Sequence, residues 1–168
     1  MLIVDDLVDI RRLLRAWAEV EGYQPLEASN GNQAVELALS EKPEVIIMDI
    51  MMPGKDGLTA IKEIRQSDPI TGIVVLTAYG TEQRAVQAMR VGADDYMHKP
   101  FDAAELRVKL ASVLQKQQLR IENQQLQTRL HDILNRFMPS SVVEQLMRAP
   151  EMPHLGGERQ IISILAAN

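Results

Sequence analysis

The stretch EVIIMDIMMPGKDG, residues 44–57, indicates how this chain folds. Its apolar, largely β-branched run 45–48 predicts a buried strand. The Pro53-Gly54 and Asp56-Gly57 pairs predict a loop after that strand. Asp49 stands where the strand ends. In an open parallel sheet, ligands bind beyond the carboxyl ends of the strands, so Asp49 is a candidate functional residue.

The same alternation of strand and helix signals continues to about residue 115. Strands are predicted near 1–4, 24–28, 44–48, 72–77 and 94–97. Helices are predicted near 8–21, 31–41, 57–67, 82–91 and from 102 onward. Five such repeats predict an α/β fold with a doubly wound parallel sheet. By analogy with flavodoxin-like folds, we expect the strand order 2-1-3-4-5.

Polar side chains follow or close four of the predicted strands: Asp5, Asp6, Asp49, Thr77 and Lys99. Because the carboxyl ends of parallel strands share one edge of a sheet, we expect these groups to converge. Adjacent carboxylates repel one another, and Mg²⁺, which prefers hard oxygen ligands, is the natural cation to neutralise them. A carboxylate nucleophile with Mg²⁺, an ammonium and a hydroxyl is typical of an aspartyl-phosphate site.

Four motifs carry a resemblance to a known family: residues 3–6 (IVDD), 48–57 (MDIMMPGKDG), 76–78 (LTA) and 92–101 (GADDYMHKPF). With them, residues 1–115 resemble the receiver domain of two-component response regulators. The resemblance implies that a sensor histidine kinase phosphorylates Asp49. It also implies that Mg²⁺ is held by Asp5 or Asp6, together with Asp49 and the backbone carbonyl of Met51.

The same resemblance gives roles to three further residues of the predicted site. It implies that Thr77 and Lys99 bind the phosphoryl group and that Tyr96 is an aromatic switch residue. The Lys99-Pro100 bond resembles the cis peptide of this family, which X-Pro bonds adopt at modest cost.

Each of these residues also has a simpler interpretation. A strand-end Asp is often a helix N-cap, Thr77 could be a turn residue, and Tyr96 could belong to the core. Trp17 is expected in the core. We assign no role to His98 and His131, which are expected at the surface. Cap, turn or strand-edge positions are expected for four other acidic residues: Asp9, Asp56, Asp94 and Asp95.

Composition limits the class of protein. The chain has 168 residues, a net charge of -5, 46% hydrophobic residues and no Cys, which suits one domain with an appendage. It contains no apolar run of the roughly 20 residues that a membrane span needs. The acidic balance argues against nucleic-acid binding. The lack of Cys fits a reducing compartment, so a cytoplasmic protein is expected.

The helix predicted from residue 102 is much longer than one domain needs, because neither Pro nor Gly occurs from 102 to 138. Residues 116–137 carry a heptad seam made of Leu119, Asn123, Leu126, Leu130, Ile133 and Phe137. Asn123 at an a position favours a parallel homodimer in fixed register. Apolar residues 110, 114 and 121 fit another frame, so we expect a stutter near 121–125. The alternative is a long amphipathic helix packed on its own domain.

The sequence pattern of residues 138–168 indicates the start of another domain. Pro139 marks a boundary, and the isolated strand pattern at 161–167 has no partner after it, so we expect a truncated output domain. Residues 137–146 (FMPSSVVEQL) and 155–167 (LGGERQIISILAA) resemble the entry into class III adenylate/guanylate cyclase domains. Asn168 departs from that family, which usually has a metal-binding Asp there, and a neutral amide binds Mg²⁺ more weakly.

Three functions fit these patterns. The first is a phosphorylation switch that relays its signal through the dimeric coiled coil to the output domain. The second is a receiver fold that serves as a constitutive dimerisation module. The third is a Mg²⁺-dependent phosphatase with an aspartyl-phosphate intermediate. That class needs a second acid/base Asp shortly after the nucleophile, and Met51 occupies the position two residues on.

Overall fold

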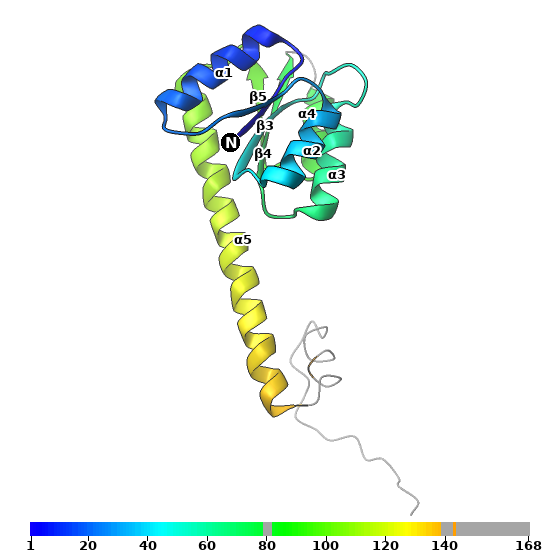
Figure 1. Ribbon diagram of the computed structural model, residues 1–168, viewed down its shortest axis with the longest axis vertical. Coiled ribbons are helices and arrows are strands. Elements are labelled where there is room, and N and C mark those ends of the chain that lie inside the picture. Colours follow the sequence, from blue (N-terminus) through cyan, green and yellow to red (C-terminus); the bar gives the residue numbers. More distant parts are fainter. Residues whose placement is uncertain (79–81, 139–142, 144–168) are drawn as a thin grey trace, which may run out of the picture. The chain divides into compact units, whose positions relative to one another are not determined.

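The computed structural model describes residues 1–78, 82–138 and 143, in which strands and helices alternate from one end to the other (Figure 1). The described elements are β1 (Leu2–Val4), α1 (Val8–Val20), β2 (Leu26–Ala28), α2 (Gly31–Glu41), β3 (Val45–Asp49), α3 (Gly57–Ser67), β4 (Gly72–Ala78), α4 (Glu82–Val91), β5 (Asp95–Lys99) and α5 (Ala103–Phe137). The predicted fivefold strand–helix alternation is confirmed.

The five strands form one parallel sheet in the order β2-β1-β3-β4-β5. Ile46 of β3 lies opposite Leu2 of β1 on one side and opposite Ile73 of β4 on the other. The flavodoxin-like order predicted from the sequence is therefore confirmed. It places β1 and β3 side by side, so the residues after Val4 and Met48 are neighbours at one edge of the sheet.

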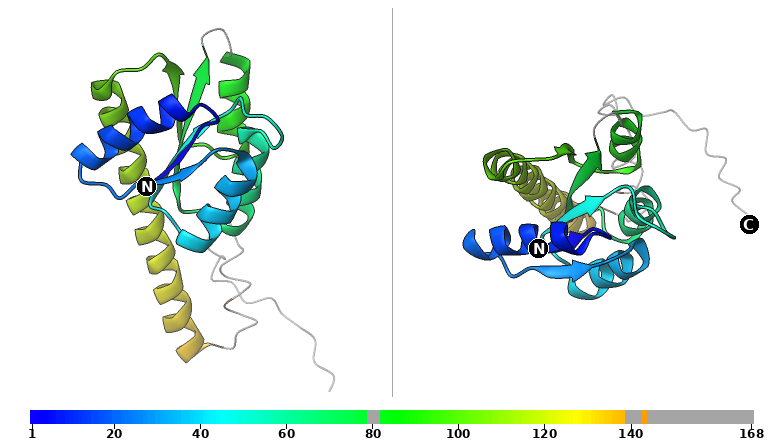
Figure 2. Two further views of the ribbon diagram at one scale, coloured as in Figure 1. Left: turned by 45° about the horizontal axis from the view of Figure 1, so that its top comes forward. Right: turned by 90° about the horizontal axis from the view of Figure 1, so that it is seen from above.

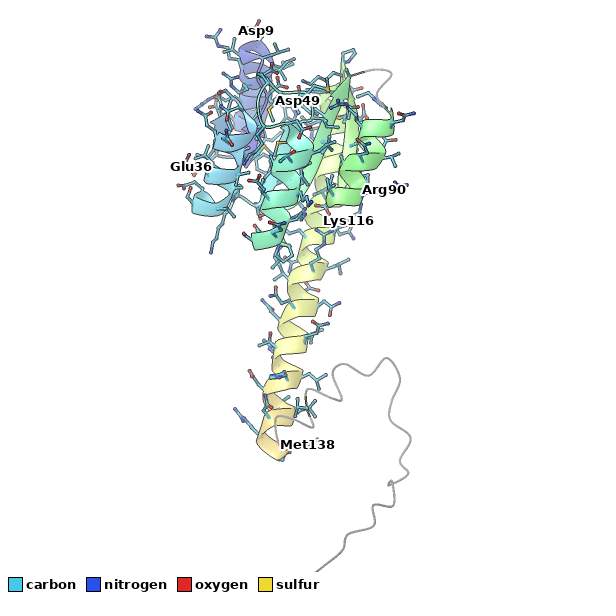
Figure 3. All side chains as sticks on the ribbon, turned by 90° about the vertical axis from the view of Figure 1, so that its right-hand side faces the viewer. Asp9, Glu36, Asp49, Arg90, Lys116 and Met138 are labelled. Carbon is cyan, nitrogen blue, oxygen red and sulfur yellow. The ribbon has the colours of Figure 1, made fainter. Side chains whose placement is uncertain are left out.

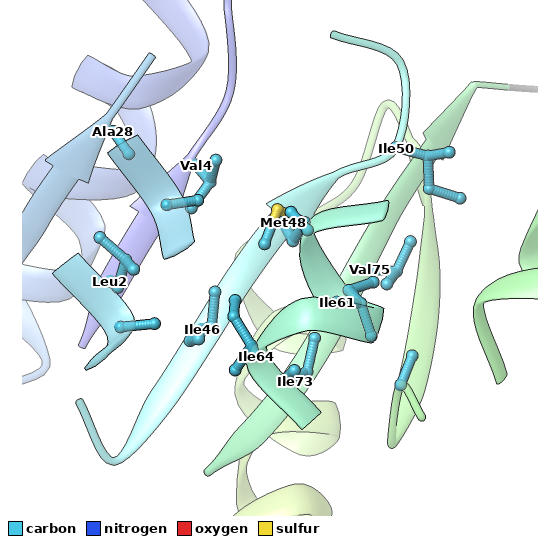
Figure 4. Close-up of a cluster of buried hydrophobic side chains, with 14 of the residues drawn as sticks. Leu2, Val4, Ala28, Ile46, Met48, Ile50, Ile61, Ile64, Ile73 and Val75 are labelled. Carbon is cyan, nitrogen blue, oxygen red and sulfur yellow. The ribbon is translucent and has the colours of Figure 1, made fainter. Parts of the chain in front are cut away.

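Helices cover both faces of the sheet (Figure 2). On one face, α2, α3 and α4 pack on alternate strand residues, and Figure 4 shows this cluster around Ile46, Met48 and Ile61. On the other face, α1 and α5 pack on the residues between them, such as Ile3 and Ile47. Each fully buried Leu or Ile stabilises the fold by about 1.5–3 kcal/mol, so both faces contribute to the core.

Side-chain caps start α2 and α3, the helices that precede and follow β3 in the chain. Asn30 caps α2 by accepting from the backbone N–H groups of Asn32 and Gln33. Asp56 caps α3 by accepting from Thr59 N at 2.9 Å, as its expected role as a cap residue requires. Such caps stabilise a helix by about 1 kcal/mol. The cap at Asp56 fixes the end of the loop that begins at Asp49.

Helix α5 uses two different faces along its length. Its first turns bury Leu106, Leu110, Val113 and Gln117. The apolar seam that follows is exposed, with 60% of Leu119 and 64% of Leu126 accessible to solvent. The frame of Leu110 and Leu114 is thus the one that packs on the sheet. The seam frame presents apolar side chains outward, and its pairing in a dimer remains a prediction.

The expected linker and cyclase-like start, residues 138–168, lie outside the described residues apart from Met138 and Val143. Among the residues that are described, no helix combines the length and the apolar character that crossing a membrane requires.

Candidate functional site

Three carboxylates meet at the carboxyl edge of the sheet. Asp5 and Asp6 follow β1, and Asp49 is the last residue of β3. One carboxylate oxygen from each lies within 4.8 Å of the others. The pairing of Val4 with Met48 brings the following residues, Asp5 and Asp49, level with each other. Figure 3 shows Asp49 at this edge of the domain.

Local hydrogen bonds orient the two buried carboxylates. Asp5 is fully buried, and its Oδ1 accepts from Leu7 N at 2.9 Å. Asp49 is 5% exposed, and its Oδ1 accepts from Met51 N at 3.0 Å. Neither residue is a helix N-cap, because Leu7 holds that position in α1 and Asp56 holds it in α3. The second oxygen of each carboxylate, Oδ2, takes its partner from another strand, β5.

Lys99 joins these second oxygens. Its Nζ lies 2.6 Å from Asp5 Oδ2 and 2.5 Å from Asp49 Oδ2. Met97 and Lys99 are two residues apart on β5, so both face the side of the sheet that α1 and α5 cover. The Lys99-Pro100 peptide is cis, as predicted. One ammonium against three carboxylates leaves this site with an excess of negative charge.

The electrostatics of the site favour a bound cation. Burial raises the pKa of Asp5 above its ordinary value, although hydrogen bonds from Lys99 and Leu7 N oppose the rise. Burial alone would lower the pKa of Lys99, but its hydrogen bonds to Asp49 and Asp5 raise it instead. Lys99 therefore stays charged at neutral pH. The hard, anionic oxygens that remain are a donor set that fits Mg²⁺.

Thr77 lies on β4 opposite His98 of β5, with its side chain buried. Its Oγ1 is 2.9 Å from Nδ1 of His98, a hydrogen bond whose donor depends on the imidazole tautomer. No role was predicted for His98, because a single sequence gives no sign of cross-strand register. The structure shows it partly buried and in contact with a candidate site residue.

Tyr96 connects this part of the site to α5. The residue is 38% exposed, so it is not a plain core residue. The ring meets the His98 imidazole edge to face, with 5.5 Å between centroids. Lys109 of α5 places its Nζ 5.5 Å from the Tyr96 ring centroid and also pairs with Asp95 at 2.9 Å. These contacts form a continuous path from Thr77 to α5.

Asp94 was expected at a cap, turn or strand-edge position. It directly precedes β5, and it is also the centre of a buried ion-pair cluster. Its carboxylate, 2% exposed, pairs with Arg65 of α3 and Arg120 of α5. Lys116 donates to the Asp94 carbonyl at 3.1 Å. Lys116 and Asp49 lie toward opposite ends of the domain in Figure 3, so this cluster is separate from the acidic site.

Comparison with known proteins agrees with this geometry. A sequence profile of the response regulator receiver domain matches residues 1–111. The regulatory protein AtoC of Escherichia coli K12 is 40% identical over 122 residues, which are 73% of this chain and 26% of AtoC. The transcriptional regulatory protein ResD of Bacillus subtilis 168 is 40% identical over 116 residues, 69% of this chain and 48% of ResD. The chain thus spans about a quarter to a half of these relatives.

Solved structures show the same fold. The receiver domain of NtrX from Brucella abortus superposes with a TM-score of 0.65 and 33% identity, covering 68% of this chain and 97% of that one. NtrX from the same organism in complex with ADP gives a TM-score of 0.72 and 30% identity. That alignment covers 88% of this chain and 32% of NtrX.

Proposed function

The chain belongs to the response regulator receiver domain family, and we propose on that basis that Asp49 is its phosphoacceptor. In this proposal a sensor histidine kinase is the phosphodonor and Mg²⁺ is the cofactor. The observation that carries the proposal is the bridge from Lys99 to both Asp5 and Asp49 at the acidic edge of the sheet. Receiver domains as a family accept phosphoryl groups on Asp.

The proposed transfer uses the Asp49 carboxylate as nucleophile. A carboxylate oxygen bonds to phosphorus while the bond from phosphorus to the phosphohistidine nitrogen breaks. The imidazole keeps the electron pair and is reprotonated from solvent. Asp5, Asp6, Asp49 and the Met51 carbonyl would hold Mg²⁺, which supplies charge neutralisation for the phosphoryl oxygens. Lys99 stays at the site and pairs with a phosphoryl oxygen.

The phosphorylated state would then act through Thr77. Phosphorylation replaces the single charge of the Asp49 carboxylate with about two negative charges on the phosphoryl group, and it adds new acceptor oxygens. The Thr77 hydroxyl turns to donate to one of these oxygens and gives up its contact with His98. Tyr96 turns inward into the space released, which removes its ring from Lys109 of α5. A change at Asp49 would reach α5 by this sequence of contacts.

The output of the switch is proposed to lie beyond α5. The exposed seam Leu119, Asn123, Leu126, Leu130, Ile133 and Phe137 fits a parallel coiled-coil homodimer. A change at α5 would alter the pairing of the two helices and so the arrangement of two C-terminal output domains. The cyclase-like character of that output rests on the sequence of residues 137–167. Neither a constitutive dimerisation module nor a phosphatase gains support from the relatives.

The test is phosphoryl uptake from a small phosphodonor with Mg²⁺, followed by intact-mass spectrometry. The wild-type chain should gain one phosphoryl group, and Asp49→Asn should gain none. Asp56→Asn is the matched control, because Asn also caps helices well and the residue lies in the same loop. Uptake by Asp49→Asn at wild-type level would refute the assignment of Asp49. Steady release of phosphate from a small ester would favour the phosphatase instead.

A further inference from the structure

Arg11 of α1 hydrogen-bonds to the backbone of Asp5 and Asp6, two of the three acidic residues of the site. Its Nη1 donates to the carbonyl of Asp5 at 2.8 Å and to the carbonyl of Asp6 at 3.1 Å. We propose that Arg11 is a positioning residue for the metal site and fixes the loop from which Asp5 and Asp6 present their side chains. This inference rests on the proposed function, because it concerns the cation that the acidic residues would hold.

The loop is held from two sides. On the β2 side, Asp5 N donates to the Ala28 carbonyl at 3.2 Å. On the α1 side, Nη1 of the Arg11 guanidinium donates to two consecutive carbonyls. The rigid, planar guanidinium holds both hydrogen bonds in one orientation. Together these bonds leave little freedom to the backbone at Asp5 and Asp6. A cation that needs its oxygen ligands in defined places benefits from such restraint.

Glu27 of β2 fixes Arg11 in turn. The Arg11 Nε lies 3.3 Å from Glu27 Oε2, and the Arg11 side chain is only 15% exposed. Arg15, one turn further along α1, binds the other oxygen of Glu27 at 2.7 Å. The other partner of Arg15 is Glu19, on the same helix. The two arginines therefore share a helix, a charge and a partner, but it is Arg11 that hydrogen-bonds to the loop.

The direction of the change in metal affinity distinguishes a positioning role of Arg11 from a purely electrostatic one. A guanidinium near a cation site repels the cation, so removing it for electrostatic reasons alone should tighten metal binding. If Arg11 acts by holding the loop, removing it should weaken metal binding instead. Loss of a group that orients metal ligands typically weakens affinity 10- to 100-fold. The two explanations therefore predict changes in opposite directions.

The experiment titrates the unphosphorylated protein with Mn²⁺, a paramagnetic ion that takes the same hard oxygen ligands as Mg²⁺. Electron paramagnetic resonance of free Mn²⁺ gives the affinity without any phosphoryl transfer. Arg11→Gln is expected to bind Mn²⁺ about 10-fold more weakly than wild type. Arg11→Lys keeps the charge and can donate to one carbonyl, so it should recover part of the loss. Arg15→Gln should bind at the wild-type level or slightly more tightly.

Equal or tighter binding by Arg11→Gln would overturn the inference while leaving the phosphoacceptor proposal intact. Circular dichroism of each variant identifies a folding defect, and Arg11→Lys then decides the question. A wild-type protein that binds no Mn²⁺ above the level of Asp49→Asn would instead contradict the proposed metal site itself. The two failures are thus distinguished within one set of titrations.

Discussion

The Thr77 hydroxyl and the His98 imidazole are hydrogen-bond partners across β4 and β5, with 2.9 Å between Oγ1 and Nδ1. In the proposed switch, a phosphoryl group on Asp49 needs the same hydroxyl. His98 and the phosphoryl oxygens therefore compete for Thr77. The hydrogen bond to His98 stabilises the unphosphorylated arrangement and opposes the phosphorylated one.

Removing this competitor should favour the phosphorylated arrangement. His98→Leu is expected to bind beryllofluoride, which mimics the phosphoryl group on Asp49, about 2- to 12-fold more tightly than wild type. The estimate follows from a net hydrogen-bond contribution of about 0.5–1.5 kcal/mol. Titration followed by fluorine NMR measures the affinity. His98→Asn is the control, because its amide can still bond to Thr77 and should bind near the wild-type level. Weaker binding by His98→Leu would show that His98 assists the phosphorylated state.

A second prediction concerns the buried charge of Asp5. Burial raises the pKa of this carboxyl, so the folded protein disfavours the ionised form more than the unfolded chain does. Stability from Asp5 is therefore greatest at low pH and is lost as pH rises through the folded pKa. Asp5→Asn should be more stable than wild type near neutral pH without metal, by on the order of 1 kcal/mol. Lys99 keeps its partner Asp49 in this variant.

Urea unfolding in EDTA at several pH values tests this prediction. The advantage of Asp5→Asn should shrink as the pH falls, because the wild-type carboxyl then becomes neutral as well. Asp9→Asn is the control, since Asp9 is exposed in the first turn of α1. Its stability should change by less than about 0.5 kcal/mol. A less stable Asp5→Asn at neutral pH would mean that the ion pair with Lys99 outweighs the cost of burial.

These residues also show what the sequence alone could and could not predict. The apolar runs before Asp5 and Asp49 mark buried strands, and parallel topology then brings their ends together. His98 and Arg11 were missed for a different reason. The contact of His98 depends on register between β4 and β5, and that of Arg11 depends on the reach of a long side chain across a loop. Neither is encoded in a local pattern.

Asp94 illustrates the same limit at the other end of the sheet. It follows Gly92-Ala93 in the sequence and so fits a turn or strand-edge position. In the structure Asp94 is buried and pairs with Arg65 of α3 and Arg120 of α5. These two helices are distant from each other in the sequence. Only the assembled sheet brings these three charges together.

Substitutions of Asp94 and of its partner Arg120 should differ sharply in how much they lower the free energy of unfolding. Asp94→Ala removes the ion-pair partner of Arg65, whose side chain is 13% exposed, and it removes the acceptor for Ile73 N. Breaking such a buried pair costs about 3 kcal/mol or more. Arg120→Ala leaves the pair of Asp94 with Arg65 in place, and the Arg120 side chain is 41% exposed. Its cost should stay below about 1 kcal/mol.

Urea unfolding of the two variants measures this difference. Arg129→Ala, an exposed position further along α5, controls for the change of an Arg in the helix itself. Equal losses of stability for Asp94→Ala and Arg120→Ala would mean that the ion pair with Arg120 provides most of the stabilisation from this cluster. The carbonyls of Gly92 and Thr71 would then be sufficient partners for Arg65.

The last prediction concerns the exposed seam of α5. Leu126 lies at a d position of the heptad pattern and is 64% exposed in the single chain. In a parallel dimer this side chain would be buried against its copy. Leu126→Glu should therefore weaken dimerisation strongly, because two buried carboxylates would face each other. Gln125→Glu adds the same charge at the neighbouring c position, away from the seam, and should leave the dimer intact.

Light scattering with Mg²⁺, with and without beryllofluoride, gives the mass of each variant. A wild-type dimer in both states would mean that phosphorylation rearranges a preformed coiled coil. A monomer that dimerises only with beryllofluoride would mean that phosphorylation drives assembly itself. If Leu126→Glu has the wild-type mass in both states, the seam does not form the dimer. Asn123→Ile then gives a separate check, because loss of the paired amides should strengthen a true seam while relaxing its register.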